Sequence, residues 1–144
     1  MQRIDVYLIG GMGKFGKDRF EEGNEWRKYF IHEFAKYFSR KEVHVINPNE
    51  YYNFLDDSKH DTQREIMEFD INKVRGSKFC ICNFNDPSSL GSMAELAIAY
   101  ERRVPVIGLN EDGAVLHPWQ EEMCAKIFTS REDVLFYALN YYLD

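Results

Sequence analysis

Hydrophobic and polar positions along the chain follow two alternating patterns, which predict strands and helices in turn. Short apolar runs typical of buried strands occur in "IDVYLIGG", "EVHVINP", "SKFCICNF" and "VPVIGL", and "IF" forms the core of a short further strand. Glycine, proline or other turn residues bound most of these runs. About five strands are therefore expected.

The segments between these runs have the apolar spacing of helices. After Asn24, a candidate cap, aromatic residues recur every four positions, at Trp26, Phe30, Phe34 and Phe38. Further helices are expected over about residues 62–75 and 92–102, in "HPWQEEMCAK" and in "SREDVLFYALNYYLD". The stretch "NEYYNFLDDSKHD" has no clear period and is expected to be a surface loop.

Strands that alternate with helices indicate an α/β fold, here a three-layer sandwich of flavodoxin-like or Rossmann-like type with a parallel sheet. No linker or repeat divides residues 1–144, so a single domain is expected. In the strand order 2-1-3-4-5, ligands bind beyond the carboxyl ends of the first and third strands, where the order reverses. The loops expected there are "GGMGKFGK" and "NDPSSLGS".

Composition and charge exclude several classes of function. The chain has 144 residues, a formal net charge of −6 and no long basic stretch, which argues against a nucleic-acid polymer as partner. The apolar run near the N-terminus has only about six residues, too few for a signal peptide or a membrane span. We therefore expect a soluble, cytoplasmic protein with no membrane partner.

Cysteine and histidine positions show no spacing typical of a metal site. Cys80 and Cys82 are two residues apart in a predicted strand, so they face the same side, and we interpret them as small buried hydrophobes. Free cysteines agree with a reducing compartment. Neither a metal nor a cofactor is expected.

The glycine-rich loop after the first strand is a candidate for ligand binding. Glycines at a strand end, here Gly10 and Gly11, leave backbone N–H groups open to an anion. Their spacing matches neither a nucleotide P-loop nor a complete G-x-G-x-x-G fingerprint that opens a helix. A flexible connecting loop is the alternative interpretation.

Asp70 is a candidate acid. It lies four residues from Ile66 and from Val74, on or beside the apolar face of its predicted helix. Partial desolvation there would raise its pKa, so that it holds a proton near neutral pH. The alternative is an acid at the edge of the apolar stripe, paired with Lys73 or Arg75.

Glu95 is a candidate nucleophile with a strong structural alternative. Ser92 and Glu95 fit the S-x-x-E capping box, which would tie the carboxylate to the start of its helix. The helix dipole would keep a carboxylate ionised there, and an ionised carboxylate beside a ligand can act as a nucleophile. The combination with Asp70 and Tyr7 favours chemistry, because two carboxylates in different environments are typical of enzymes that cleave glycosidic bonds.

These residues lie in segments that resemble a known family. "VYLIGG", "FDINKVRGSKFCICNF" and "PSSLGSMAELAIAYERRVPVIGL" are similar to the nucleoside 2-deoxyribosyltransferase superfamily, which includes the 2'-deoxynucleoside 5'-monophosphate N-glycosidases. The resemblance covers most of the chain. It matches Asp70 to the aspartate of a D-[IL]-N motif, Glu95 after Gly91 to the nucleophile of G-x-x-x-E, and Tyr7 to a first-strand tyrosine.

The resemblance implies an enzyme that works through a covalent intermediate. Glu95 would attack the anomeric carbon of a 2'-deoxynucleoside, Asp70 would protonate the leaving base, and Tyr7 would orient the carboxylate. A second nucleobase would then accept the deoxyribosyl group, as in purine and pyrimidine salvage. If water is the acceptor, the protein is instead a hydrolase, an N-glycosidase of deoxynucleoside 5'-monophosphates.

Ser89 bears on the choice between these activities. The resemblance implies an aspartate at this position in nucleoside transferases and a phosphate-binding serine in the monophosphate N-glycosidases. A hydroxyl avoids the repulsion between a carboxylate and a phosphate. We expect substrate contacts from Ser89 and Gly91, and from Gly10 and Gly11 across the crevice.

The region after the fourth strand is expected to lie near an interface. The resemblance implies that a neighbouring subunit completes the pocket here, so a homo-oligomer, a dimer or higher, is expected. His117 is a candidate contact for a phosphate or a 5'-hydroxyl. Tyr51 and Tyr52 either stack on the base or pin their loop to the domain.

Two other classes of function are open on the residues alone. A non-catalytic nucleotide-binding module would use the same crevice, although two carboxylates facing a phosphorylated ligand would not help it bind. A reductase of flavodoxin type is disfavoured, because no loop rich in Thr and Ser follows the first strand.

Overall fold

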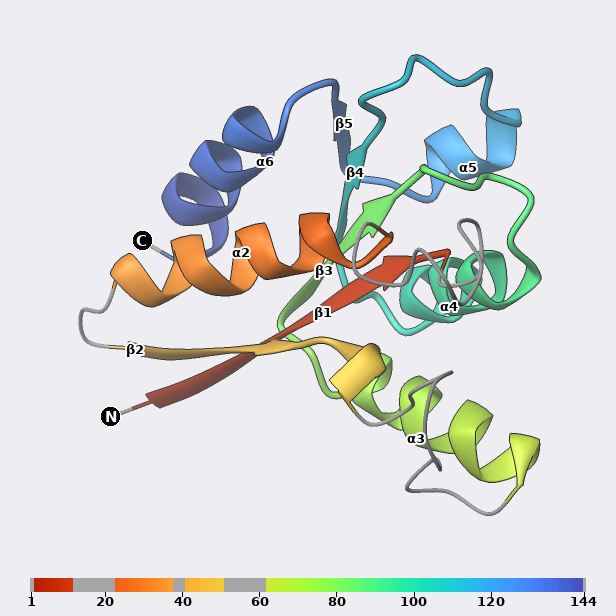
Figure 1. Ribbon diagram of the computed structural model, residues 1–144, viewed down its shortest axis with the longest axis horizontal. Coiled ribbons are helices and arrows are strands. Elements are labelled where there is room, and N and C mark those ends of the chain that lie inside the picture. Colours follow the sequence, from red (N-terminus) through yellow and green to blue (C-terminus); the bar gives the residue numbers. More distant parts are fainter. Residues whose placement is uncertain (1, 12–22, 38–40, 51–61, 144) are drawn as a thin grey trace.

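A computed structural model of the chain describes residues 2–11, 23–37, 41–50 and 62–143 (Figure 1). The strands are β1 (Gln2–Gly10), β2 (Lys41–Ile46), β3 (Phe79–Asn83), β4 (Val106–Leu109) and β5 (Lys126–Phe128). The helices are α2 (Glu25–Lys36), α3 (Gln63–Arg75), α4 (Leu90–Glu101), α5 (Pro118–Glu122) and α6 (Arg131–Tyr137). A 3₁₀ turn (Pro48–Glu50) follows β2, and a π-helical turn (Ala138–Tyr142) follows α6.

All strand pairs in the described sheet are parallel, and the strand order is β2-β1-β3-β4-β5. The predicted α/β class and the order 2-1-3-4-5 are confirmed. Tyr7 of β1 pairs with Cys80 of β3, and Gly10 pairs with Asn83 at the end of both strands. The order reverses between these two strands, so the loops that follow them meet at one edge, where such folds bind ligands.

Helices cover both faces of the sheet, with α2 and α6 on one side and α3 and α4 on the other (Figure 1). Alternate residues of β1 enter different cores, because side chains along a strand point to opposite faces. Val6 and Leu8 join the α2–α6 core. Tyr7 joins the opposite core together with Cys80 and Cys82, so the interpretation of these cysteines as buried hydrophobes is confirmed.

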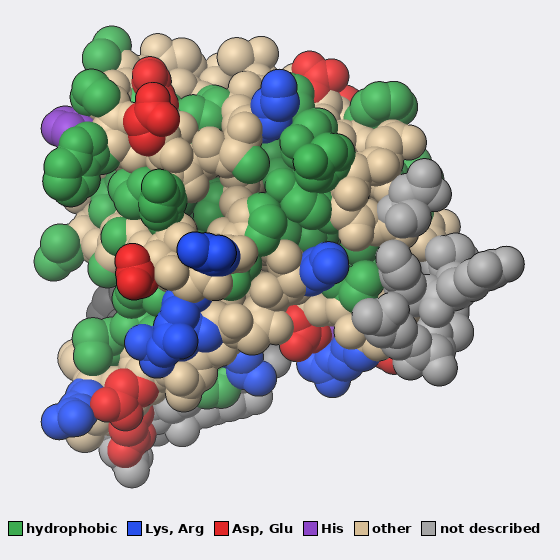
Figure 2. Space-filling view, turned by 180° about the vertical axis from the view of Figure 1, so that it is seen from behind, with side chains coloured by type: hydrophobic (Ala, Val, Ile, Leu, Met, Phe, Trp, Pro, Cys, Tyr) green, Lys and Arg blue, Asp and Glu red, His purple; other side chains and the backbone are tan. Residues whose placement is uncertain are grey.

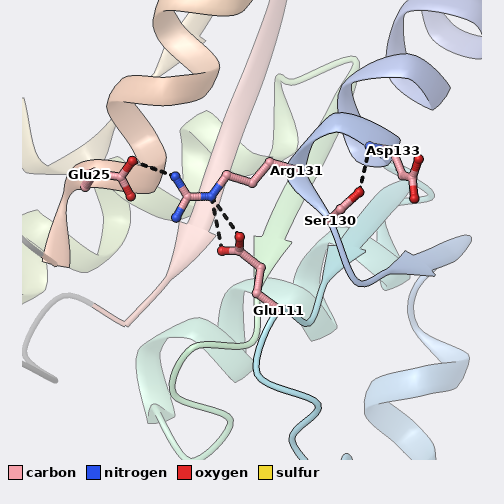
Figure 3. Close-up of polar contacts among 5 residues, drawn as sticks. All are labelled: Glu25, Glu111, Ser130, Arg131 and Asp133. Carbon is pink, nitrogen blue, oxygen red and sulfur yellow. Dashed lines mark hydrogen bonds and ion pairs between the residues drawn. The ribbon is translucent and has the colours of Figure 1, made fainter.

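The starts of α6 and α2 are formed differently. Ser130 caps α6, accepting a hydrogen bond of 3.2 Å from the backbone N–H of Asp133 (Figure 3). Asn24 precedes α2, but its side chain makes no capping bond. Asn24 stands at the N-cap position, where the prediction placed it, but its Oδ1 accepts hydrogen bonds from the buried side chains of Asn47 and Asn49 and not from the helix.

One arginine joins three segments beyond the carboxyl ends of β1 and β4. Arg131 at the start of α6 donates to Glu25 in the first turn of α2 at 2.7 Å (Figure 3). It also donates to Glu111 in the loop after β4, at 3.0 Å. The ion pairs hold the first turn of α2, which continues into Trp26 and Arg27.

The described surface carries hydrophobic and charged groups side by side. In the rear view, Lys and Arg side chains are interspersed with Asp, Glu and hydrophobic side chains (Figure 2). No helix among the described residues has the length and apolar character needed to cross a membrane. Phe38, Tyr51 and Tyr52 lie outside the described residues.

Candidate functional site

A pocket of about 460 Å³ lies between α3 and α4 at the carboxyl end of β1. Its lining includes Gly10 from β1, Asp70 from α3, Ser89 just before α4, and Gly91 and Glu95 from α4. The volume falls in the range typical of small-molecule sites. The structure therefore brings most of the sequence-predicted site residues to one pocket.

Glu95 has no capping role. The cap of α4 is Ser89, whose Oγ accepts from the backbone N–H of Ser92 at 3.4 Å, and the helix begins at Leu90. Glu95 therefore lies beyond the first turn, where intrahelical bonds already satisfy the backbone. The capping-box prediction is wrong, because it placed the cap at Ser92, three residues after the true cap at Ser89. The carboxyl group is left for the pocket.

Tyr7 stands behind Glu95 in the core. The Tyr7 side chain is fully buried, and its hydroxyl and the Oε2 atom of Glu95 are both closed to solvent. Within the described residues neither atom makes a hydrogen bond of standard geometry, yet the hydroxyl is close enough to lower the pKa of Glu95.

Burial dominates the electrostatics of Glu95. Desolvation raises its pKa to about 8, against the smaller opposing effects of the Tyr7 hydroxyl and Arg27. Asp70 adds to the rise by charge repulsion. The dipole of a helix acts mainly within its first turn, and Glu95 lies beyond that turn, so the expectation that the helix N-terminus keeps this carboxyl group ionised is not supported.

Asp70 behaves as its place beside an apolar stripe predicts. Burial raises its pKa to about 6, while Arg27 acts in the opposite direction. Within the described parts of the chain, no ion pair joins Asp70 to Lys73 or Arg75, and the ammonium of Lys73 lies over the ring of Phe69 at 5.3 Å. The alternative of a surface acid paired with a neighbour is not supported.

The pair of carboxyl groups shares one proton over the physiological range. With pKa values of about 6 and about 8, both groups are protonated below that window and both are ionised above it. Because the two groups interact, these values belong to the pair, and within the window one proton is shared between the two carboxyl groups. The arrangement can therefore both donate a proton and present a carboxylate.

Arg27 is a buried residue beside the pocket lining that the sequence analysis did not single out. It comes from α2 and is fully buried, and its Nη2 donates to the carbonyl oxygen of Gly10 at 2.9 Å. Burial lowers its pKa to about 10, so the guanidinium still carries its charge at neutral pH. Tyr7, Glu95 and Asp70 all act on that charge.

The two glycines after β1 differ in their roles. Gly10 lines the pocket, and an added Cβ would lie 2.5 Å from Cζ2 of Trp26, so this position has no room for a side chain. The backbone N–H of Gly11 donates to the side chain of Asn85 at 3.4 Å. Gly11 thus connects the loops that follow β1 and β3, and it is not among the described residues of the pocket lining.

His117 is not brought to this pocket within one chain. It caps the short helix α5, and its Nδ1 accepts from the backbone N–H of Trp119 at 3.1 Å. Gln120 completes this capping box and also donates to the carbonyl oxygen of Pro87 at 2.9 Å. The histidine therefore has a structural role in the isolated chain.

Other features of the described residues offer no comparable chemistry. A second hollow, of about 400 Å³, is lined by residues around Cys124 and Lys126 and contains Glu121 as its one described acid. In the parts of the chain that are described, no three His, Cys, Asp or Glu side chains are grouped to hold a metal ion. The paired carboxyl groups single out the pocket between α3 and α4.

Comparison with known proteins finds this fold in solved structures. A conserved protein from Enterococcus faecalis V583 matches with a TM-score of 0.74 and 16% identity, over 93% of this chain and 96% of the other. A 2-deoxyribosyltransferase from Bacillus psychrosaccharolyticus matches with a TM-score of 0.67 and 15% identity, over 90% and 89%. A CMP N-glycosidase from Clostridium botulinum matches with a TM-score of 0.60 and 14% identity, over 95% and 99%.

No protein-family model matches the chain, and no curated protein sequence matches it. At identities near those of the structural matches, the likeness establishes a shared fold. The resemblance of the sequence is thus matched at the level of the fold, which this chain shares with a 2-deoxyribosyltransferase.

Proposed function

We propose that this chain cleaves the N-glycosidic bond of 2'-deoxynucleosides and transfers the deoxyribosyl group to another nucleobase. The observation that carries the proposal is the pocket in which Glu95 and Asp70, from neighbouring helices, are both held at raised pKa values. The shared fold with a 2-deoxyribosyltransferase supports the same reaction class.

In the first half-reaction, a carboxylate oxygen of Glu95 attacks C1' of the sugar. The bond between C1' and the base nitrogen breaks, and its electron pair stays on the base. Asp70 gives its proton to the leaving base and becomes ionised, which is general acid catalysis. The product is a covalent glycosyl ester of Glu95, formed with inversion at C1'.

In the second half-reaction, a nitrogen of the acceptor base attacks C1' from the opposite side. Glu95 leaves as a carboxylate, and Asp70 takes the proton that the acceptor loses. Two inversions give net retention. Atoms and protons balance, so no cofactor is required for the cycle.

The productive form has an ionised Glu95 and a protonated Asp70. It holds the same number of protons as the form that dominates between about pH 6 and about pH 8. The two forms differ only in which of the two carboxyl groups holds the proton. The Tyr7 hydroxyl favours this shift, because it stabilises the Glu95 carboxylate. We therefore expect a bell-shaped pH–rate profile with limbs near these two values.

Hydrolysis of deoxynucleoside 5'-monophosphates is the second candidate function. Ser89 supports it, because this residue lines the pocket at the start of α4, a helix terminus that favours an anion. The shared fold with a CMP N-glycosidase also supports it. Ser89→Asp would place a negative charge beside a 5'-phosphate, so it should weaken monophosphate binding and spare free nucleosides.

Product analysis separates these functions. The chain is incubated with 2'-deoxynucleosides or with their 5'-monophosphates, with and without a second nucleobase, and products are separated by chromatography. A new nucleoside that needs the second base supports transfer, and free base with deoxyribose 5-phosphate supports hydrolysis. Binding by calorimetry without turnover of any substrate would contradict both and favour a non-catalytic nucleotide-binding module.

Assembly into a dimer or a higher homo-oligomer is part of the proposal. Leu90 and Met67 are on the pocket lining and are 85% and 53% exposed, and a symmetric partner would cover them. Light scattering should give a mass of at least twice 17.1 kDa. A monomer that is active at high dilution would contradict this part.

A further inference from the structure

Arg27 is a buried charge that the proposed reaction leaves unexplained. Its Nη2 donates to Gly10, and its guanidinium lies over the ring of Trp26 at 4.5 Å. Its Nε and Nη1 atoms are buried and have no hydrogen-bond partner among the described residues. A cation that is fully buried lowers stability unless its charge is compensated, so packing alone does not account for this arginine.

The groups that interact with Arg27 belong to the carboxylate site. Tyr7 comes from β1, Asp70 from α3 and Glu95 from α4, and all three favour the charged guanidinium. The connection is structural as well, because Gly10 both accepts from Arg27 and lines the pocket with the two carboxyl groups. A helix on one side of the sheet thus contributes a charge to chemistry on the other.

The environment of Glu95 shows what that charge provides. The ionisable groups that face Glu95 are the Tyr7 hydroxyl, the Asp70 carboxyl, and the thiols of Cys80 and Cys82 in β3. Burial raises the pKa of both thiols, so they stay protonated, and Asp70 when ionised repels Glu95. Among the described residues that act on Glu95, Arg27 is the one cation.

We propose that Arg27 is a positioning residue whose buried positive charge keeps an ionised Glu95 attainable in a dry pocket, while its bond to Gly10 fixes the end of β1 beside the substrate. The part of this proposal that concerns catalysis rests on the proposed function. The effect of Arg27 on the pKa of Glu95 does not depend on turnover and is tested separately.

The first test measures the ionisation of Glu95 directly. Infrared difference spectra between each protein and its Glu95→Gln counterpart isolate the Glu95 carboxyl band, which is followed against pH. In Arg27→Met, which keeps length and removes charge, we expect the Glu95 midpoint at higher pH by about one unit or more, a tenfold change in the ionisation constant. In Arg27→Lys, which keeps the charge, the midpoint should stay closer to that of the unmodified chain. Equal midpoints in the unmodified chain and Arg27→Met would overturn the proposal.

The second test uses the pH profile of deoxyribosyl transfer. Arg27 opposes the raised pKa of both Glu95 and Asp70, so Arg27→Met should move both limbs to higher pH. At about pH 6, kcat should fall by roughly tenfold, with a smaller change in KM. Arg27→Lys should restore the limbs. An arginine that only supports the fold would lower thermal stability and leave the limbs in place, which would also overturn the proposal.

Two outcomes, a variant that does not fold and a chain without activity, are each covered by a separate measurement. If Arg27→Met does not fold, Arg27→Gln takes its place against Arg27→Lys, and equal Glu95 midpoints in those two variants overturn the proposal. If the unmodified chain cleaves no nucleoside, the proposed function fails, and the infrared titration still decides whether Arg27 sets the ionisation of Glu95.

Discussion

The two faces of the sheet are lined by alternate residues of the same strands, yet they bury different chemistry. On the α2–α6 face, Val6 and Leu8 of β1 meet a row of aromatic rings, with Phe30 and Phe34 stacked at 6.2 Å between centroids. On the α3–α4 face, Tyr7 lies behind a carboxyl group, Glu95, whose pKa burial raises to about 8.

The difference indicates that one face serves mainly stability and the other holds the candidate site. The aromatic face gains stability from apolar burial and ring contacts. The α3–α4 face keeps Glu95 and Asp70 in surroundings that disfavour their ionised forms, and residues held in that way are typical of active sites rather than of stable cores. Arg27 links the two faces, because it belongs to α2 on the aromatic face and its charge interacts with Glu95 and Asp70 on the other face.

The largest expected effect is on turnover and comes from Glu95→Gln. Glutamine keeps the shape but is not a nucleophile, so turnover should fall by about 10⁴-fold or more. Chromatography of the products measures it, and circular dichroism checks the fold. Glu101→Gln, an exposed change at the end of the same helix, is the matched control and should leave the rate unchanged. A Glu95→Gln variant with near-normal turnover would remove this residue from the mechanism.

A change on the aromatic face should do the opposite. Phe34 is 2% exposed and packs against Phe30 and Phe79, so Phe34→Ala should lower the free energy of unfolding by about 3–5 kcal/mol. The pH limbs of the folded variant should not move. Urea unfolding measures the loss, and Phe136→Ala, at a side chain that is 70% exposed, is the control with a change of about 0.5 kcal/mol or less. Shifted pH limbs in Phe34→Ala would show that the two faces are not independent.

Asp70→Asn should lower the rate of cleavage in a way that depends on the leaving base. The amide cannot donate the required proton, so cleavage of substrates with poor leaving groups such as adenine should slow by about 10²–10⁴-fold. Activated bases leave without that proton and should slow much less. Glu68→Gln, at an exposed side chain on the same helix, controls for the lost charge. Equal slowing for both kinds of base would mean that Asp70 only positions the substrate.

The fold was predictable because its signals are local and repeated. Every strand coincides with an apolar run, and alternation with helices leaves few topologies other than a parallel sheet. The start of α4 was less predictable, since Ser89 and Ser92 both fit a capping residue and only the backbone geometry shows which hydroxyl accepts the bond. That ambiguity of a few residues produced the mistaken cap at Glu95.

The site was predictable in part. Asp70 beside an apolar stripe already indicated a raised pKa, because helical spacing and desolvation are linked. Arg27 also had a signal, since it lies three residues before Phe30 and seven before Phe34, on the face that becomes buried. Its effect on the other side of the sheet was not predictable, because it depends on how β1 ends against α2. His117 was predicted only as a ligand contact, and its role as the cap of α5 emerged from the backbone geometry.

The smallest expected effect is on stability against pH, and it tests whether the α3–α4 face is strained by its charges. The folded pKa of Glu95, about 8, lies above its ordinary value of 4.5, so between these values the folded chain binds more protons than the unfolded chain. Stability therefore falls as pH rises through this window, and Asp70 adds a similar fall below about pH 6.

Glu95→Gln removes the fall in stability that Glu95 causes, which is the greater of the two. Urea unfolding should give similar stability for both proteins near about pH 5, and should favour Glu95→Gln by a few kcal/mol near about pH 9. Glu101→Gln should follow the unmodified chain at both values, and a Glu95→Gln curve parallel to these two would show that the Glu95 carboxyl ionises without cost to the fold.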